Sequence, residues 1–364
     1  MSPGPWFFLV HGITWTALGT IILVATWWLF HQRAVKNAAA RHAAWTMVFF
    51  GLAVLPMFQV GRHVFFSRSL KTTLKGKSKG VEVSSPAVAR NPVASAPAEC
   101  HPIPESSQTG TLLGTILAGA WLSGTLLVLG RFGVAWSQLR NWKAKSLPFP
   151  SEALDYHWLQ ARSGISGDFE LRISSLPEPK VPITWGLWHP VVLLPRAAPD
   201  WSRPRLEAVV LHELGHVRRR DHATQLLALL VCAIHWFNPV FWRSARKMES
   251  DAEIAADDFA ILAGFAPSTY AAELLHLASY LRPQSQATTL VETSMDKPFT
   301  LENRIRSIID PASNRGPVSF WSWVGVQCLP WLLVLTVGFL PWSLFDPPSA
   351  LPENRSNPSC IAPP

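Results

Sequence analysis

Two histidines and a glutamate in the segment LHELGHV (211–217) have the types and spacing of a zinc site. His212 and His216 are four residues apart in a run with helical apolar spacing, so their rings project from one face of the predicted helix. Two imidazoles placed in this way can bind one Zn²⁺. Glu213 follows the first histidine and can take a proton from a metal-bound water, whose pKa the metal lowers to about 7. The pattern predicts hydrolysis of a peptide bond with Glu213 as the catalytic base.

A catalytic zinc site has three protein ligands and an open position, so a third ligand is expected further along the chain. The segment MESDAEIAADDFAIL (248–262) is predicted to be a helix, and Glu253 and Asp257 share one of its faces. We interpret Glu253 as the third zinc ligand. Asp257 is interpreted as the acceptor for the free N–H of a ligating histidine. Glu249 lies on the same face one turn earlier, so spacing alone leaves it open as a ligand.

Other acidic and histidine residues in this region are given structural interpretations. Glu249, Asp251 and Asp258 are interpreted as a solvated acidic face. His222 lies about 240° round the helix from the second zinc histidine, so it is expected to face elsewhere. His235, in an apolar context, is interpreted as a packed or interfacial residue.

The composition indicates a membrane protein. Of the 364 residues, 48% are hydrophobic and only 15% are charged, against about 25% in an average soluble domain. Crossing a bilayer takes about 20 apolar residues, and runs of that length lie at 6–30, 43–66, 111–136 and 321–345. The net charge of +8 is attributed to basic loops beside anionic lipid. No nucleic-acid-binding motif accompanies this charge, so no direct nucleic acid binding is expected.

The distribution of charge predicts how the spans are oriented. No charged residue precedes the first run, unlike in a secretory signal peptide, so we interpret it as an uncleaved span. With the N-terminus outside, residues 31–42 and 137–320 are cytoplasmic and hold 3 and 20 Lys and Arg residues. The loop 67–110 and the tail 346–364 then lie outside and hold 6 and 1. This asymmetry favours the stated orientation, with both termini outside.

Residues 137–320 are expected to form the one folded domain of the chain. Short strands are predicted at 169–174, 181–185 and 190–195, and helices at 151–163, 204–220, 224–237, 244–263, 268–281 and 300–309. The expected fold is a multi-pass α-helical membrane protein with four transmembrane helices and a mostly helical α+β, zincin-like metallopeptidase domain. Strand 190–194 is expected to offer its edge to an extended peptide.

The apolar run 226–237 follows the predicted zinc helix closely. Its roughly 12 residues are too few to cross a bilayer, and it ends at Asn238-Pro239. The stretch Arg218-Arg219-Arg220 precedes it, and each arginine near anionic lipid contributes about 1 kcal/mol. We interpret the run as a core or interfacial helix that holds the protease against the bilayer. A buried helix of a soluble core is the alternative.

The segment 67–110 is interpreted as an extracytoplasmic linker loop, because its second half, rich in Ser, Pro, Ala and Val, has no periodicity. In the predicted topology Cys100 and Cys360 lie on the same oxidising side of the membrane. A disulfide between them is a hypothesis, and two unrelated thiols are the alternative.

Three ordered segments carry a resemblance to a known family: LHELGHVRRRDH (211–222), IHWFNPVFW (234–242) and MESDAEIAAD (248–257). With them the chain resembles, over roughly residues 5–345, the BlaR/MecR-type membrane metallopeptidases. These are zinc-dependent signalling proteases of bacterial antibiotic-sensing systems. Segments 181–195 and 301–310 are similar to the Pro/Gly-rich segment before the zinc helix and the short basic helix before the last span in that family.

The resemblance implies a domain order and a location. It places four spans in the bacterial cytoplasmic (inner) membrane, with the protease domain in the cytoplasmic loop between the third and fourth. Its implied substrate is a cytoplasmic protein, either a winged-helix repressor, as for an antirepressor, or the chain itself. Contact with membrane lipid and a homo-oligomer are further expectations.

The resemblance also assigns roles to individual residues. Zinc would be held by His212, His216 and Glu253, with Glu213 as the catalytic base. Asp257 matches the acidic residue that closes the family's Glu-x-x-x-Asp pattern. The family often has Cys just before that aspartate, where this chain has Ala256.

One departure bears on sensing. Family members that sense β-lactams carry a penicillin-binding domain after the fourth span. The 19 residues after Phe345 contain no Lys and therefore no Ser-x-x-Lys acylation motif. We expect no direct β-lactam sensing by these residues.

Two other functions compete with a signalling protease. A membrane quality-control or prenyl-protein-processing protease shares a zinc motif with a later Glu and has several spans. A non-catalytic transmembrane coupling protein would use zinc only structurally. Glu213 argues against the second alternative, because a purely structural site has no use for that carboxylate.

Overall fold

Two helices are long and apolar enough to cross a membrane in the computed structural model, which describes residues 5–31, 36–54, 107–150, 169–281 and 297–316, together with Leu154, Leu159 and residues 162–165. They are α1 (Pro5–His31) and α3 (Ser107–Ala144), whose candidate spans are Gly12–Phe30 and Leu112–Ala144. A shorter apolar helix, Ala38–Val54, covers the first part of the second expected span. The fourth expected span, residues 67–106 of the expected linker, Cys100 and Cys360 lie outside the described residues, and the last four residues of that linker, 107–110, belong to α3.

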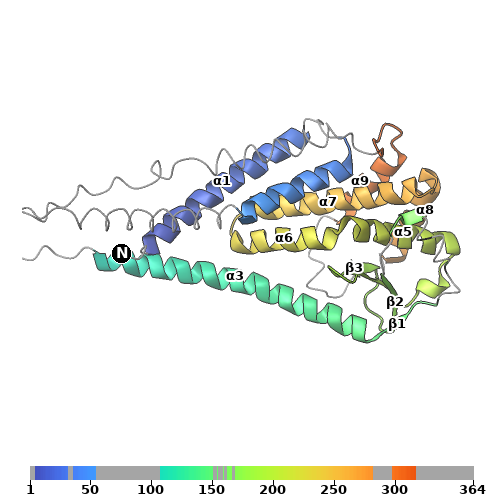
Figure 1. Cartoon of the computed structure of the whole chain (residues 1–364), viewed down its shortest axis with the longest axis horizontal. Coiled ribbons are helices and arrows are strands. Elements are labelled where there is room, and N and C mark those ends of the chain that lie inside the picture. Colours follow the sequence, from blue (N-terminus) through green and yellow to red (C-terminus); the bar gives the residue numbers. More distant parts are fainter. Residues whose placement is uncertain are drawn as a thin grey trace, which may run out of the picture.

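The remaining elements build a mostly helical unit with a small sheet at one end of the spans (Figure 1). The helices follow the predicted ones with shifted ends: α5 (Arg203–Arg219), α6 (Asp221–Ile234), α7 (Pro239–Leu262), α8 (Pro267–Leu281) and α9 (Lys297–Ile309). The start of α7 is five residues earlier than predicted, because Pro239 begins the helix and the Asn238 side chain accepts a hydrogen bond from the backbone N–H of Val240. Most of the helix predicted at 151–163 lies outside the described residues.

The sheet is mixed, with the strand order β1-β2-β4-β3. Its strands are β1 (Ser146–Pro148), β2 (Glu170–Ser174), β3 (Ile183–Trp185) and β4 (Val191–Leu194); β2 and β4 run parallel, and the two outer pairs are antiparallel. The prediction that strand 190–194 offers a free edge is wrong, because β4 is hydrogen-bonded on both sides. Among the described strands, β3 forms one edge of the sheet and pairs only with β4.

Burial of both faces explains why β4 has an apolar residue at every position. Val192 and Leu194 pack into the cluster that contains the buried face of α5. Val191 and Leu193 face the other way, toward Trp136 and neighbouring residues of α3. The end of α3 beyond the predicted span therefore covers the sheet, which ties the third span directly to the unit that carries the predicted site.

The helices α6 and α7 form a hairpin that lies between α1 and α3 (Figure 1). Apolar residues of this hairpin share one buried cluster with α1 and with the helix Ala38–Val54; on the hairpin they are Ala228, Val231, Cys232, Phe241 and Met248. The unit that carries the predicted site is thus packed against the first, second and third predicted spans.

The acidic face predicted on α7 is solvated at one position only. Glu249 is exposed, as expected. Asp251 is fully buried and pairs with Arg41 at 2.9 Å and Lys247 at 3.0 Å. Asp258 is also buried and pairs with Arg315 at 3.1 Å. The solvated interpretation is wrong for these two aspartates, because Arg41 and Arg315 approach them from segments that the helical periodicity of α7 does not show, whereas Lys247 lies one turn earlier on α7 itself.

Candidate metal centre

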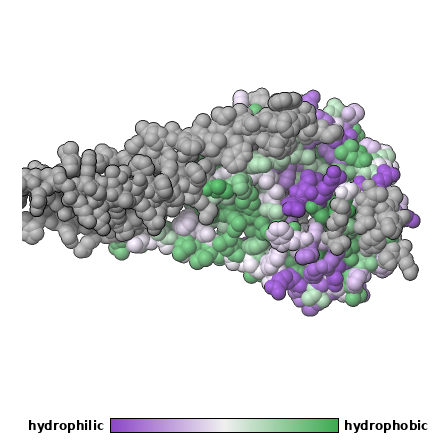
Figure 2. Space-filling model, in the orientation of Figure 1, coloured by the Kyte–Doolittle hydropathy of each residue, from purple (hydrophilic) through white to green (hydrophobic). Residues whose placement is uncertain are grey.

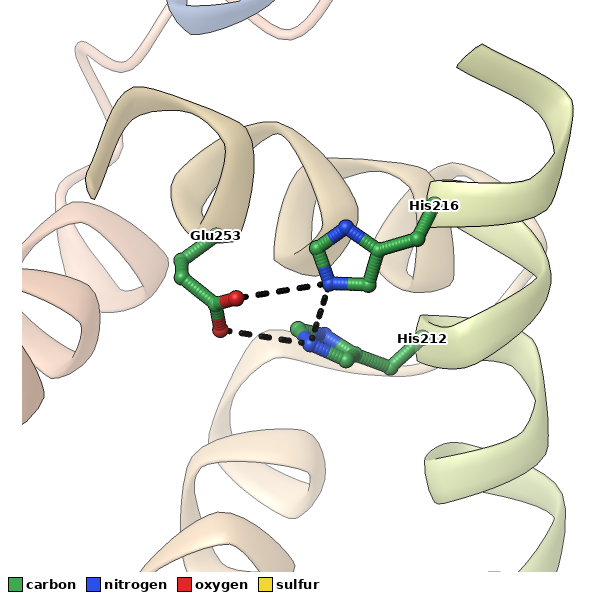
Figure 3. Close-up of side chains that lie close together, drawn as sticks. All are labelled: His212, His216 and Glu253. Atoms are coloured by element: carbon green, nitrogen blue, oxygen red, sulfur yellow. Dashed lines mark hydrogen bonds and ion pairs between the residues drawn. The ribbon is translucent and has the colours of Figure 1, made fainter. Parts of the chain in front are cut away.

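The two histidines of α5 and the glutamate of α7 converge on one point (Figure 3). The Nε2 atoms of His212 and His216 are 3.2 Å apart. The Glu253 oxygens Oε2 and Oε1 lie 3.5 Å and 3.4 Å from these two nitrogens, respectively. Two nitrogens bound tetrahedrally to zinc at about 2.0–2.1 Å would be about 3.3 Å apart. The spacing of the three side chains therefore fits a single zinc ion.

The outer nitrogen of each histidine faces a carboxylate. Nδ1 of His212 is 3.0 Å from Oδ1 of Asp257, and Nδ1 of His216 is 2.7 Å from Oδ2 of Asp221. A hydrogen on each Nδ1 satisfies these carboxylates and leaves the lone pair of each Nε2 directed at the convergence point. Two such lone pairs and a carboxylate repel one another unless a proton or a metal ion lies between them, so this donor set is suited to bind a metal cation.

The turn between α5 and α6 brings Asp221 to its histidine. Arg220 has φ 56° and ψ 41°, a left-handed conformation that costs a non-glycine residue about 1–2 kcal/mol. Its backbone N–H donates to the carbonyls of His216 and Val217, which ends α5. The next residue, Asp221, is buried and also accepts hydrogen bonds from Arg219. The residue that adopts this unfavourable conformation therefore directly precedes the aspartate that orients His216, a predicted zinc ligand.

A partly buried arginine from α9 organises the α7 side of the centre. Arg304 donates to both oxygens of Asp257, at 2.8 Å and 2.7 Å, and lies 2.9 Å from Oε2 of Glu253. Tyr270 of α8 donates to Oδ1 of Asp257 at 2.7 Å and lies 3.1 Å from Nδ1 of His212. With α6, which supplies Asp221, five helices (α5, α6, α7, α8 and α9) therefore contribute to the site.

Electrostatics keep the two carboxylates of α7 ionised. Burial raises the pKa of Glu253, but the adjacent Arg304 and the histidines outweigh burial and hold that pKa well below its ordinary value. Burial likewise raises the pKa of Asp257, and Arg304 more than offsets it, so that the pKa falls to about 2. Both groups can therefore serve as anionic acceptors at neutral pH.

The same negative charge acts on His212. Burial lowers its pKa, but the hydrogen bonds with Asp257 and Glu253 outweigh burial and raise the pKa to about 9. A position that favours a proton in this way also favours a metal cation, and the two compete for the same nitrogen.

Glu213 lies beside the three converging side chains and is not one of them. Its side chain is buried, and its Oε2 accepts a hydrogen bond of 2.6 Å from the hydroxyl of Thr184 in β3. The edge strand of the sheet is therefore in direct contact with the predicted catalytic base. This arrangement places a carboxylate, an edge strand and a metal-binding donor set together.

The close approach of α5 and α7 depends on a glycine inside the motif. A Cβ atom at Gly215 would lie 3.3 Å from Cα of Ala256 and 3.1 Å from Cδ1 of Phe259. Ala256, where the related family often has Cys, is fully buried in this contact. Small residues on both helices let Glu253 approach the histidines.

The structure also locates the other residues considered from the sequence. Glu249 does not belong to the converging group. His222, as predicted, faces away from the centre, and its ring stacks on Trp136 of α3 at a centroid distance of 6.1 Å. His235 is buried and stacks on Phe241 at 4.2 Å, in agreement with a packed residue.

Four residues of the site were not predicted: Asp221, Tyr270, Arg304 and Thr184. Three of them lie in or next to segments that stand out in the sequence. Asp221 follows the basic run 218–220, Thr184 lies in the predicted strand 181–185, and Arg304 lies in the segment LENRIRSIID. Their contacts with the centre depend on tertiary packing, so no spacing rule identifies them. Tyr270 lies in an ordinary amphipathic helix and carries no such signal.

A comparison with protein families decides which group of proteins this arrangement represents. The model of the family described as BlaR1 peptidase M56 matches residues 7–308. The chain belongs to the BlaR1 peptidase family M56. This is a family of membrane metallopeptidases, and the resemblance seen in the sequence is confirmed. The matched region contains α1, α3 and every residue of the candidate centre.

Individual relatives match over shorter stretches. The regulatory protein BlaR1 of Bacillus licheniformis is 34% identical over 90 residues, which are 25% of this chain and 15% of the relative. The methicillin resistance mecR1 proteins of Staphylococcus aureus and Staphylococcus epidermidis are each 31% identical over 77 residues, or 21% of this chain and 13% of the relative. These matches thus span less than a sixth of the length of the curated relatives.

Proposed function

We propose that the chain is a membrane-bound zinc endopeptidase of a bacterial signalling system, which hydrolyses peptide bonds of a cytoplasmic protein. The observation that carries the proposal is the convergence of the inner nitrogens of His212 and His216 with the carboxylate of Glu253, next to Glu213. Membership of a metallopeptidase family supports it. The names of the relatives, a regulatory protein and resistance proteins, support a role in signalling.

In the proposed mechanism, His212, His216 and Glu253 hold the metal. Zinc, when bound there, would polarise the scissile carbonyl and lower the pKa of water. Glu213 takes a proton from the attacking water and passes it to the leaving amine. The hydroxyl of Thr184 donates to Oε2 of Glu213, and Oε1 would accept the proton.

The edge strand β3 is the proposed docking site of the substrate backbone. It is hydrogen-bonded only to β4 among the described strands, and it contacts the proposed base through Thr184. An extended peptide added to this edge would bring its carbonyl groups past Glu213. The edge of β3 thus replaces the edge of strand 190–194, which was predicted from the sequence to bind an extended peptide.

The substrate proposed is a transcriptional repressor of the winged-helix type or the chain itself. The proposal includes the predicted topology, with four spans in the bacterial cytoplasmic membrane, the protease domain in the cytoplasm and both termini outside. It also includes a homo-oligomer and contact with membrane lipid.

The test compares purified wild type, Glu213→Gln and the control Glu207→Gln, whose residue lies on the same helix and pairs with Arg203 at the surface. Zinc content and fragments of the chain or of an added repressor are measured together. We expect one zinc per chain in all three and fragments only from wild type and the control. Cleavage that persists in Glu213→Gln, or a wild type without zinc, would contradict the proposal.

A further inference from the structure

The α6–α7 hairpin has the composition of a membrane segment around its turn. From Ala223 to Trp242 the chain contains no Asp, Glu, Lys or Arg. Large apolar side chains point outward: Leu230 is 51% exposed, Ile234 44% and Phe237 51%. On the face shown in Figure 2, hydrophobic residues gather on the side of the spans, and hydrophilic residues gather at the opposite end. An aqueous surface would not favour such an arrangement.

The tip of the hairpin meets α1 in the middle of its candidate span, Gly12–Phe30. Phe241 packs so closely on Gly19 that a Cβ there would lie 2.8 Å from its ring. The side-chain amide of Asn238 donates to the hydroxyl of Thr20 at 2.8 Å. Both contacts are about half-way along the span.

The tip meets α3 at a corresponding level. The indole N–H of Trp121 donates to the carbonyl of Ile234 at 2.8 Å, and that of Trp236 donates to the carbonyl of Trp121 at 3.2 Å. Gly124 lies against the Trp236 indole, where a Cβ atom would overlap the ring. Gly124 is near the middle of the span expected from the sequence, 111–136, and twelve residues into the candidate span Leu112–Ala144. Both spans therefore meet the hairpin well inside the stretches that could cross a bilayer.

Several polar groups of the turn have hydrogen-bond partners within the protein. The N–H of His235 donates to the carbonyl of Val231, and that of Asn238 to the carbonyl of His235. The indole N–H of Trp242 donates to the carbonyl of Trp236 at 3.0 Å. A turn at hydrocarbon depth requires this pattern, because no water is available there for exposed backbone groups.

We propose that the α6–α7 hairpin is a re-entrant intramembrane element. Its tip, residues 234–239, lies near the bilayer midplane, and its outward face, formed by Leu230, Ile234 and Phe237, contacts lipid acyl chains. The hairpin enters from the side of the zinc centre and returns to it, so His216 and Glu253 lie just before and just after the membrane passage. The inference does not depend on catalysis.

The experiment measures the depth of single cysteines in the full chain reconstituted in phosphatidylethanolamine–phosphatidylglycerol nanodiscs. The background replaces Cys100, Cys232, Cys328 and Cys360 with Ala. Leu230→Cys is compared with Leu262→Cys, since both leucines are exposed and Leu262, at 62%, lies at the far end of α7. A membrane-impermeant maleimide measures access from water, and a nitroxide label measures collisions with oxygen and with a nickel chelate.

We expect the maleimide to react at position 230 at least about tenfold more slowly than at 262 in nanodiscs. The nitroxide at 230 is expected to collide mainly with oxygen, and the one at 262 mainly with nickel. Equal maleimide rates would overturn the proposal. So would a label at 230 that neither reagent reaches, because protein and not lipid would then cover this face. Ile234→Cys, tested in the same way, keeps the experiment decisive if Leu230→Cys lowers the yield of folded protein.

Discussion

Each histidine of the candidate centre has its own carboxylate, and the two carboxylates differ in their surroundings. Asp257 accepts hydrogen bonds from Arg304 and Tyr270 as well as facing His212. Asp221 faces His216 and accepts from Arg219. These contacts fix the orientation of both imidazole rings before a metal arrives, which reduces the entropy that binding must overcome.

The first residue-scale prediction concerns Asp221, which is outside the motif. Asp221→Asn removes the negative charge behind His216 while keeping the side-chain size. We expect the affinity for zinc to fall about 10–100-fold. Competition with a chromophoric chelator measures it. The exposed Asp310→Asn is the matched control and should bind zinc like wild type. An unchanged affinity in Asp221→Asn would show that the hydrogen bond to His216 does not orient the ligand.

The second residue-scale prediction concerns pH. The pKa of His212, about 9, lies above its ordinary value, so the histidine is protonated in the metal-depleted protein at neutral pH. Its contribution to the stability of that protein is full below about pH 6.5 and is lost as the pH rises through 9. Zinc requires the deprotonated ring, so zinc affinity should rise with pH up to about 9.

Calorimetry in buffers of different ionisation enthalpy measures this proton release. At pH 7.5 we expect zinc binding to release at least one proton per site, and at pH 9.5 fewer. His212→Gln, which has no proton to release at this position, is the comparison. A zinc affinity that does not change between pH 7 and 9 would contradict the assigned shift.

At the scale of residues, the sequence identified those members of the site whose positions depend only on the local geometry of one helix. His212 and His216 follow from a spacing of four on one helix, and Glu253 with Asp257 follows from the same rule on another. The rule leaves Glu249 open, because only packing of α7 on α5 determines which turn faces the histidines. Asp221 and Arg304 approach through a left-handed turn and a distant helix, which periodicity cannot indicate.

At the scale of elements, an ion pair ties the helix Ala38–Val54 to the helix that carries Glu253. Arg41 lies 2.9 Å from Asp251, whose side chain has no solvent exposure. Asn37, just before this helix, donates to the carbonyls of Asn314 and Gly316, beyond α9. At the other side of the site, His42 lies 3.8 Å from Asp221. The start of the second span thus contacts three parts of the proposed protease.

The element-scale prediction is that Arg41→Gln destabilises the whole unit. It leaves the buried Asp251 with Lys247 as its remaining cationic partner. We expect a loss of about 1–3 kcal/mol, the cost of an under-satisfied buried acceptor. Arg306→Gln breaks an exposed pair with Glu302 and should cost less than about 1 kcal/mol. Thermal unfolding in detergent compares them, and equal midpoints would show that the buried pair adds no stability.

The elements themselves were largely predictable, since strands and helices appear near their expected places. The elements against which each of them packs were not predictable from the sequence. The run 226–237 is too short to span a bilayer and too apolar for a surface helix, so length and composition leave its position open. The contacts of Gly19 and Gly124 place the hairpin against α1 and α3, and they need small residues in two spans whose spacing from the hairpin no local pattern shows.

At the scale of the whole molecule, the protease unit and the spans share one core. Ile22, Trp45 and Phe49 from the spans pack with Val231, Cys232 and Phe241 of the hairpin. The isolated fragment 137–316 should therefore expose the apolar surface that the spans normally cover. It also lacks Arg41, the partner of Asp251. We expect the fragment to aggregate without detergent and to bind less zinc than the full chain.

Co-expression of residues 1–66 with this fragment provides the complement. It restores Arg41 and the apolar partners from α1 and the second span, so we expect a larger soluble fraction in detergent and more bound zinc. Size-exclusion chromatography and metal analysis measure both. A monodisperse, zinc-loaded fragment 137–316 in plain buffer would show that the unit folds without the spans.

In the proposed arrangement, the length of α6 also determines the height of the zinc centre above the membrane. Its 14 residues rise about 21 Å at 1.5 Å per residue. Half of the hydrocarbon layer is about 15 Å thick. With the tip at the midplane, the first turn of α6, and with it His216, lies about 6 Å beyond the hydrocarbon, among the lipid headgroups. A substrate must then present its scissile bond within a few ångströms of the lipid surface, so an extended, detached segment can reach this protease whereas the interior of a compact domain cannot.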